Sequence, residues 1–190
     1  MATHGPGLGQ GHQRSGAPAE DGSEPAVRAG VRAVVITVSN EVAAGAEDRG
    51  GLLALDLLAD AGLPAERVVV PDQPARIRTA IRVAITDGCR FVLTCGGTGI
   101  GPTDHTAEVV RGLVAFELPG IAEEIRRRGA AHTPLALVSR QVAGAILGPG
   151  HPPVFVLAAP GSRGGVRDAL AVVSELVPYV LDQLDGAGHA

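Results

Sequence analysis

The sequence predicts an α/β fold, a three-layer α/β/α sandwich around a mainly parallel sheet. Two observations favour it: short apolar runs alternate with longer amphipathic stretches, and glycine-rich or acidic loops follow several of the apolar runs. Strands of a parallel sheet are buried on both faces and therefore read as continuous apolar runs, whereas the helices that cover the sheet carry one apolar stripe.

The first half of the chain supplies three expected strands and two expected helices. Residues 32–38 form a β-branched run, 68–70 a second run that Pro71 ends, and 91–94 a third. Between the runs, apolar residues recur at helical spacing in two stretches, namely Leu52, Leu55, Leu58 and Ala59, which Gly62 ends, and then Ile77, Ile81 and Ile85.

The second half continues the alternation less regularly. Helices are expected at 106–113 and 119–128, followed by an irregular segment to about residue 143. Two apolar runs, 145–147 and 154–157, are joined by a stretch rich in Gly and Pro, which predicts a hairpin-like connection. One final amphipathic helix is expected from residue 166 to 180, and Pro178 predicts a kink or an early stop in it.

Residues 1–29 are expected to form a disordered tail because they are dense in Gly, Pro, Ser and charge and have few large apolar residues. One folded domain is expected over residues 30–186. The 190-residue chain is 45% hydrophobic, which is enough material for one core.

Composition excludes several classes of function. A net charge of −4 and only 2% aromatic residues argue against a nucleic-acid partner. All basic residues are Arg, so a phosphate-binding or Schiff-base lysine is excluded. The absence of an apolar run of about 18 residues or of a signal peptide predicts a cytoplasmic protein with no membrane contact. Cys89 and Cys95 are expected to be buried free thiols.

Three loops that follow expected strands are candidate binding segments, because ligands gather at the carboxyl ends of parallel strands. They span residues 39–51, 94–104 and 160–165, and we call the second the glycine loop. Its backbone N–H groups and two threonine hydroxyls could bind an anion. Alternatively, its glycines serve only to form a tight turn between a strand and a helix. The candidate ligand-binding residues in this loop are Thr94, Gly96, Gly97, Thr98 and Gly99.

Two carboxylates and a serine extend the candidate site. Asp104 precedes an expected helix start, and Asp48 precedes Gly50 and Gly51. Each is either a helix-entry charge or a functional group, and a carboxylate at position 48 could hold a divalent cation that accompanies a phosphate. Ser162 precedes the last helix and predicts a second anion site. The sequence does not identify a set of metal ligands.

An ordered set of motifs resembles the MoaB/Mog family of molybdenum cofactor biosynthesis, which includes the G domain of gephyrin. Residues 94–99 (TCGGTG) and 102–108 (PTDHTAE) are similar to the family signature TTGGTG…PRDVTPEA. Further similar stretches follow the same order, at residues 37–40, 70–72, 117–123, 133–134, 139–140, 143–144 and 160–162. The resemblance covers about residues 31–184.

The resemblance implies a molybdopterin-binding domain that forms a trimer, sometimes a hexamer, and adenylylates molybdopterin with Mg-ATP. Molybdopterin, ATP, Mg²⁺ and further copies of the chain are thus the implied partners. By motif position it implies catalytic roles for Asp48 and Asp104. The residues implied to contact phosphate or pterin are Ser39, Thr94, Gly96, Gly97, Thr98, Gly99, Pro160, Gly161 and Ser162.

Several positions depart from the family pattern. Thr103 replaces an Arg and so removes a cationic fork beside the phosphates, although Arg49 or Arg163 could compensate. The other departures are Asn40 for Asp, Gly50 for Ser, Gln73 for Asp, Cys95 for Thr and Arg163 for Pro. These changes favour an alternative, a non-catalytic molybdopterin-binding scaffold or carrier, whereas the retained aspartates favour the enzyme. A stand-alone relative of the similar domain in competence-damage proteins is a third alternative.

Overall fold

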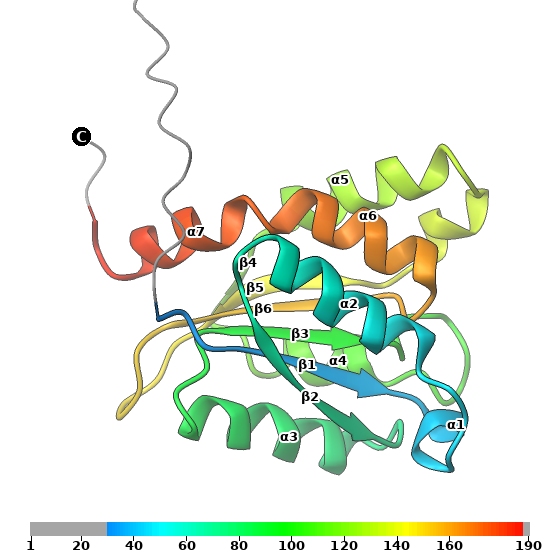
Figure 1. The fold of residues 1–190 in the computed structure, drawn as a ribbon, viewed down its shortest axis with the longest axis horizontal. Coiled ribbons are helices and arrows are strands. Elements are labelled where there is room, and N and C mark those ends of the chain that lie inside the picture. Colours follow the sequence, from blue (N-terminus) through cyan, green and yellow to red (C-terminus); the bar gives the residue numbers. More distant parts are fainter. Residues whose placement is uncertain (1–29, 188–190) are drawn as a thin grey trace, which may run out of the picture.

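The computed structural model describes residues 30–187, which form a six-stranded sheet in the order β2-β1-β3-β6-β5-β4 (Figure 1). The strands are β1 (Ala33–Val38), β2 (Ala65–Val70), β3 (Phe91–Cys95), β4 (Phe116–Glu117), β5 (Val142–Ile146) and β6 (Val154–Ala159). Strands β1, β2, β3 and β6 are parallel, while β5 and β4 are antiparallel to their neighbours. The expected tail, residues 1–29, lies outside the described residues.

Helices cover both faces of the sheet, which confirms the predicted three layers (Figure 1). One face carries α2 (Arg49–Asp60), α5 (Pro119–Ala130), α6 (Arg163–Val173) and α7 (Leu176–Leu184), and the other carries α3 (Pro74–Thr86) and α4 (Thr106–Arg111). Two shorter elements lie in connections: α1 (Asn40–Ala43) and the 3₁₀ helix η1 (Pro134–Val138).

Two hydrophobic cores separate the layers because alternate residues of a strand point to opposite faces of the sheet. On one side, Val35 and Leu93 pack with Leu58 of α2, and all three side chains are buried. On the other side, Val34 packs with Ile77 of α3. This packing fixes the sheet edge from which the three candidate loops emerge.

The expected hairpin is present, but the strands around it differ from the prediction. Strands β5 and β6 pair antiparallel from Val142↔Ala158 to Ile146↔Val154, so β5 begins before the expected 145–147 run. Its first residues are small and gave little strand signal. The two-residue strand β4 was not expected, because so short a segment has no measurable period.

The prediction of one continuous C-terminal helix is wrong, whereas the early stop predicted from Pro178 is confirmed as a break between two helices. Helix α6 ends at Val173 and α7 begins at Leu176, so the break precedes Pro178. A proline ring clashes with the carbonyl four residues earlier in a continuous helix, which here is Ser174. Pro178 instead lies in the first turn of α7, where its missing N–H is tolerated.

The first candidate loop contains a helix that was not expected. Ser39 accepts a hydrogen bond from the Val42 N–H at 3.2 Å and so begins α1.

No helix within residues 30–187 is long and apolar enough to span a bilayer.

Both cysteines are buried free thiols, as predicted. Burial raises the pKa of the Cys95 thiol to about 12. The thiol is therefore protonated at neutral pH and is unsuited to nucleophilic chemistry.

Candidate functional site

The three candidate loops meet at the carboxyl edge of the sheet, as the parallel topology predicted. A β-carbon added to Gly50 would lie 2.3 Å from the Gly161 carbonyl oxygen, and one added to Gly161 would lie 3.1 Å from the Gly96 Cα. The Gly96 N–H also donates to the Ala159 carbonyl at 2.9 Å. Glycine at these positions allows three backbone segments to touch.

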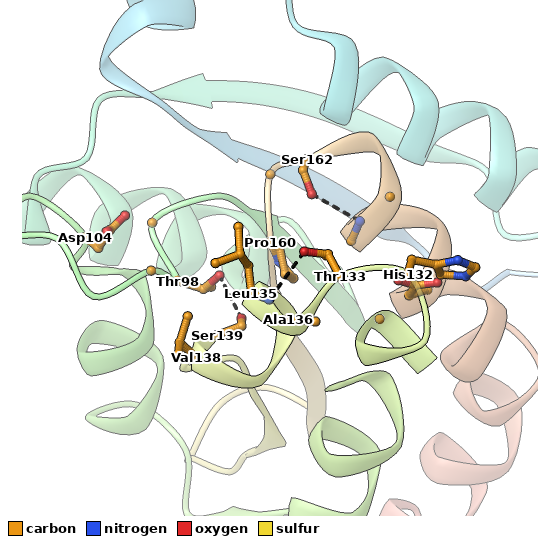
Figure 2. Close-up of a pocket in the computed structure, with 17 residues that line it drawn as sticks. Thr98, Asp104, His132, Thr133, Leu135, Ala136, Val138, Ser139, Pro160 and Ser162 are labelled. Carbon is orange, nitrogen blue, oxygen red and sulfur yellow. Dashed lines mark hydrogen bonds between the residues drawn. The ribbon is translucent and has the colours of Figure 1, made fainter. Parts of the chain in front are cut away.

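A cavity of about 590 Å³, which we call the main cavity, opens beside these contacts (Figure 2). Seven predicted site residues line it: Gly97, Thr98, Gly99, Asp104, Pro160, Gly161 and Ser162. The sequence did not indicate its apolar wall, which includes Leu135, Ala136 and Val138 of η1. A volume of this size, apolar with a few convergent polar groups, suits a small organic ligand.

Two glycines of the glycine loop are required by their backbone conformation. Gly96 and Gly97 have φ of +110° and +63°, values that side chains other than glycine rarely adopt. A β-carbon on Gly97 would also lie 2.3 Å from Thr106 Oγ1 and 2.4 Å from Asp72 Oδ2. The loop therefore passes close to α4 and exposes its backbone to the main cavity.

Asp104 lines the main cavity and does not cap α4. Its Oδ2 accepts a hydrogen bond from the Gly101 N–H at 2.8 Å, while Oδ1 has no donor within residues 30–187. Asp72 lies close by: its Oδ1 accepts from the backbone N–H of His105, the residue before α4, at 3.1 Å. Burial raises the pKa of the Asp72 carboxyl. Asp104 is therefore not the side-chain cap of α4, and one of its oxygens is available to a ligand.

Two hydroxyl groups lie on the walls of the main cavity (Figure 2). Ser162 Oγ accepts from the Gly165 N–H at 3.2 Å and caps α6, as expected for a residue at the start of that helix. Thr98 Oγ1 lies 3.3 Å from Ser139 Oγ, so one of these hydroxyls donates to the other. The start of α6 and the glycine loop thus both present groups that can bind an anion.

Arg140 holds the glycine loop in place. Its Nε donates to the Gly99 carbonyl at 2.5 Å and one terminal nitrogen donates to the Asp104 carbonyl at 2.8 Å. The other terminal nitrogen forms an ion pair with Glu108. The backbone N–H of Arg140 donates to the Thr98 carbonyl at 2.8 Å. Only a rigid planar fork satisfies these directions together.

We expect Arg140→Lys to loosen the glycine loop while the global free energy of unfolding changes little. A lysine keeps the charge but loses the fork, so amide hydrogen exchange at Gly101 and Asp104, whose N–H groups donate within the loop, should become about 10-fold faster. Arg82→Lys, at an exposed position of α3, is the matched control. Equal exchange rates in the two variants would contradict the assigned role.

A second cavity of about 290 Å³, the polar cavity, lies on the other side of Gly161, which lines both. Ser39, Asp48 and Arg49 are among its lining residues. The sequence therefore grouped residues that the structure divides between two neighbouring cavities.

Asp48 lies at the polar cavity with both carboxylate oxygens already engaged. Oδ1 accepts from the Gly51 N–H at 2.8 Å and so caps α2. Oδ2 accepts from the Thr37 hydroxyl and from the Arg67 guanidinium, each at 2.6 Å. These contacts support the helix-entry interpretation of Asp48, and a catalytic role stays a prediction.

Two predicted binding residues line neither cavity. Thr94 is fully buried, with its hydroxyl 3.5 Å from the Leu157 carbonyl, and Gly96 lies against Val38. The tight-turn alternative therefore fits Gly96. Within residues 30–187, no group of three or more His, Cys, Asp or Glu side chains is placed to hold a metal ion.

A cavity at the carboxyl edge of an open sheet, with a glycine loop, a helix N-terminus and a carboxylate around it, defines an α/β protein that binds a small anionic molecule. The chain belongs to the family described as "probable molybdopterin binding domain", whose model matches residues 34–181. This match confirms the resemblance drawn from the motifs.

Individual relatives agree with the family. The chain is 41% identical over 181 residues to a molybdenum cofactor biosynthesis bifunctional protein of Synechococcus elongatus, covering 94% of this chain and 55% of the relative, so it spans about half of that protein. It is 34% identical over 149 residues to the molybdopterin adenylyltransferase of Pyrococcus furiosus, covering 77% of this chain and 87% of that protein. A crystal structure of a molybdopterin biosynthesis protein from Mycobacterium abscessus has a TM-score of 0.75 and 37% identity, covering 82% of this chain and 97% of that one.

Proposed function

We propose that this chain acts in molybdenum cofactor biosynthesis as a molybdopterin adenylyltransferase. The observation that carries the proposal is the main cavity, where Asp104, the glycine loop and Ser162 line one space. The Pyrococcus furiosus relative bears this name and matches the chain over most of its own length.

In the proposed reaction, a phosphate oxygen of molybdopterin attacks the α-phosphorus of ATP. A new P–O bond forms, and the bond to pyrophosphate breaks. Transfer of this kind depends on positioning and charge neutralisation more than on a covalent nucleophile. Backbone N–H groups of the glycine loop and Ser162 at the start of α6 would bind the phosphates. A chain without lysine can therefore perform it.

Mg²⁺ fits this proposal as an ion carried by ATP. Mg²⁺ on a phosphate substrate is usually held by one or two carboxylates plus water, and one oxygen of Asp104 has no donor among the described residues. We assign Asp104 to the ATP-bound metal, whose charge would stabilise the phosphates. Asp48, with both oxygens engaged, would shape the polar cavity instead.

Arg140, which binds the glycine loop, does not supply the charge missing at Thr103, because Glu108 pairs with its guanidinium and the residue does not line the main cavity. Arg140 places a guanidinium against the backbone of Gly99 and Asp104. Two compensations were considered from the sequence: Arg49 pairs with Glu47 at 2.7 Å and lines the polar cavity, and Arg163 is exposed at the start of α6. The retained Asp104, rather than an arginine, therefore favours the enzyme over the non-catalytic carrier.

The proposal includes assembly as a trimer or hexamer in the cytoplasm, as the family resemblance implies. Leu135 and Leu137 of η1 are 73% and 61% exposed beside the main cavity. A second copy of the chain that covered these side chains would remove apolar surface from water.

The test is an assay of AMP transfer from Mg-ATP to freshly prepared molybdopterin, in which the release of pyrophosphate is measured. We expect release that requires molybdopterin, and a rate about 100-fold lower in Asp104→Ala, because loss of the carboxylate misplaces the metal and frees the Gly101 turn. Asp60→Ala, at an exposed position on α2, should keep the full rate. Tight molybdopterin binding without turnover would reject the transferase and leave the carrier.

A further inference from the structure

The main cavity is lined by a second carboxylate, Asp168 of α6, which the proposed reaction does not use. The side chain is partly buried and lies against α5, since a β-carbon added to Gly129 would be 3.2 Å from Asp168 Oδ2. No sequence pattern indicates a role for Asp168, because a single acidic residue on an amphipathic helix is typical of its solvated face.

Asp168 has no hydrogen-bond or ion-pair partner within residues 30–187. The nearby Arg128 is engaged elsewhere, with Glu124 at 2.8 Å and with the Ala171 carbonyl at 3.1 Å. A carboxylate withdrawn from water beside an apolar wall is unfavourable unless a donor reaches it. In the main cavity that donor would come from a ligand.

Asp168 and Asp104 lie toward different ends of the main cavity. The His132 N–H donates to the Gly129 carbonyl at 3.0 Å, and Asp168 lies beside Gly129, so Asp168 marks the His132 end. Figure 2 shows Asp104 and His132 on opposite sides, with Leu135 and Ala136 between them. A ligand with a phosphate at the Asp104 end would extend its other end along the apolar wall towards Asp168.

The chemistry of a free carboxylate selects what it binds there. It accepts two parallel hydrogen bonds and repels phosphate. The 2-amino and N3–H groups of a pterin present two adjacent donors, whereas the pairing edge of adenine presents one donor beside one acceptor. A pterin can therefore donate one hydrogen bond to each carboxylate oxygen. Adenine can donate to only one of them, and its ring nitrogen acceptor would face the other oxygen.

We propose that Asp168 is the specificity-determining residue that receives the pterin ring of molybdopterin. The inference rests on the proposed function and adds an orientation to it: the pterin occupies the His132 end and the phosphates occupy the Asp104 end. A carboxylate that accepts hydrogen bonds from two donors of the ligand discriminates against an analogue that lacks one donor. One carboxylate oxygen is then left unpaired in the cavity.

The test compares pterin with lumazine, in which a carbonyl replaces the 2-amino group, as competitors against freshly prepared molybdopterin on the full chain. The wild-type chain should prefer pterin by at least about 10-fold. Asp168→Asn should equalise or reverse that preference, because a carboxamide can donate to the 2-carbonyl of lumazine while accepting from N3–H. Asp56→Asn, an exposed position on α2, is the matched control and should keep the wild-type preference.

The outcomes separate this inference from the proposed function. If wild-type chain binds molybdopterin but shows no preference for pterin over lumazine, or if Asp168→Asn keeps the wild-type preference, the role of Asp168 is wrong and the transferase stands. If wild-type chain binds no molybdopterin, both fail. The wild-type preference is measured without any substitution, so the test does not depend on the folding of a variant.

Discussion

Gly96→Ala is expected to lower the free energy of unfolding by about 4 kcal/mol, a large share of the stability of an ordinary domain. Two effects add. The residue has φ +110°, and its β-carbon would lie 2.2 Å from the Val38 carbonyl oxygen. That oxygen belongs to the end of the central strand β1, so it cannot move away without disturbing the sheet.

Alanine substitutions at two other glycines distinguish the backbone strain from the steric contact when the free energies of unfolding are measured by urea denaturation. Gly45 has φ +104° with no atom within 4 Å of the added carbon, so Gly45→Ala should show the conformational strain alone, about 1–2 kcal/mol. Gly164 has neither constraint, and Gly164→Ala should change stability by less than about 0.5 kcal/mol. A loss in Gly96→Ala no larger than that in Gly45→Ala would show that the Val38 contact is unimportant.

Asp48→Ala is expected to destabilise the fold by about 3 kcal/mol. The substitution removes the cap of α2, which contributes about 1 kcal/mol. It also leaves the buried Thr37 hydroxyl and the Arg67 guanidinium, whose side chain is 30% exposed, without their shared acceptor, a further loss of about 2 kcal/mol. Chemical denaturation measures the sum.

A double-mutant cycle with Arg67→Ala tests the cause. If the ion pair matters, the two substitutions together should cost at least about 1 kcal/mol less than the sum of the single losses. Unchanged stability in Asp48→Ala, combined with loss of AMP transfer, would instead make Asp48 a catalytic carboxylate, as the family resemblance implied.

The part of the fold that the sequence predicted best is the parallel centre of the sheet. Strands β1 and β3 are buried on both faces, so their apolar runs are continuous and easily read. Loops that follow parallel strands must lie at the same edge of the sheet. This is why the sequence alone could place the candidate loops together at that edge. The contact between Gly50 and Gly161 follows from that topology.

The parts of the site that were missed depend on partners far away along the chain. Arg140 binds the glycine loop across a separation of 41 residues, and Asp72 accepts from the His105 N–H across 33 residues. Neither pairing leaves a local pattern; the only signals were that residues 70–72 and 139–140 belonged to family-like stretches. Asp168 lacked even that signal, since what distinguishes it is that no group in the described part of the chain donates to its carboxylate.

The two outer strands of the sheet bear on how copies of this chain can associate. Strand β4 is only two residues long, and β2 carries the charged pair Glu66 and Arg67. A continuous intermolecular sheet needs a long, uncharged margin with a row of free backbone donors and acceptors. Both margins here oppose such growth, which directs any self-association to the helical surfaces and guards the chain against amyloid-like stacking.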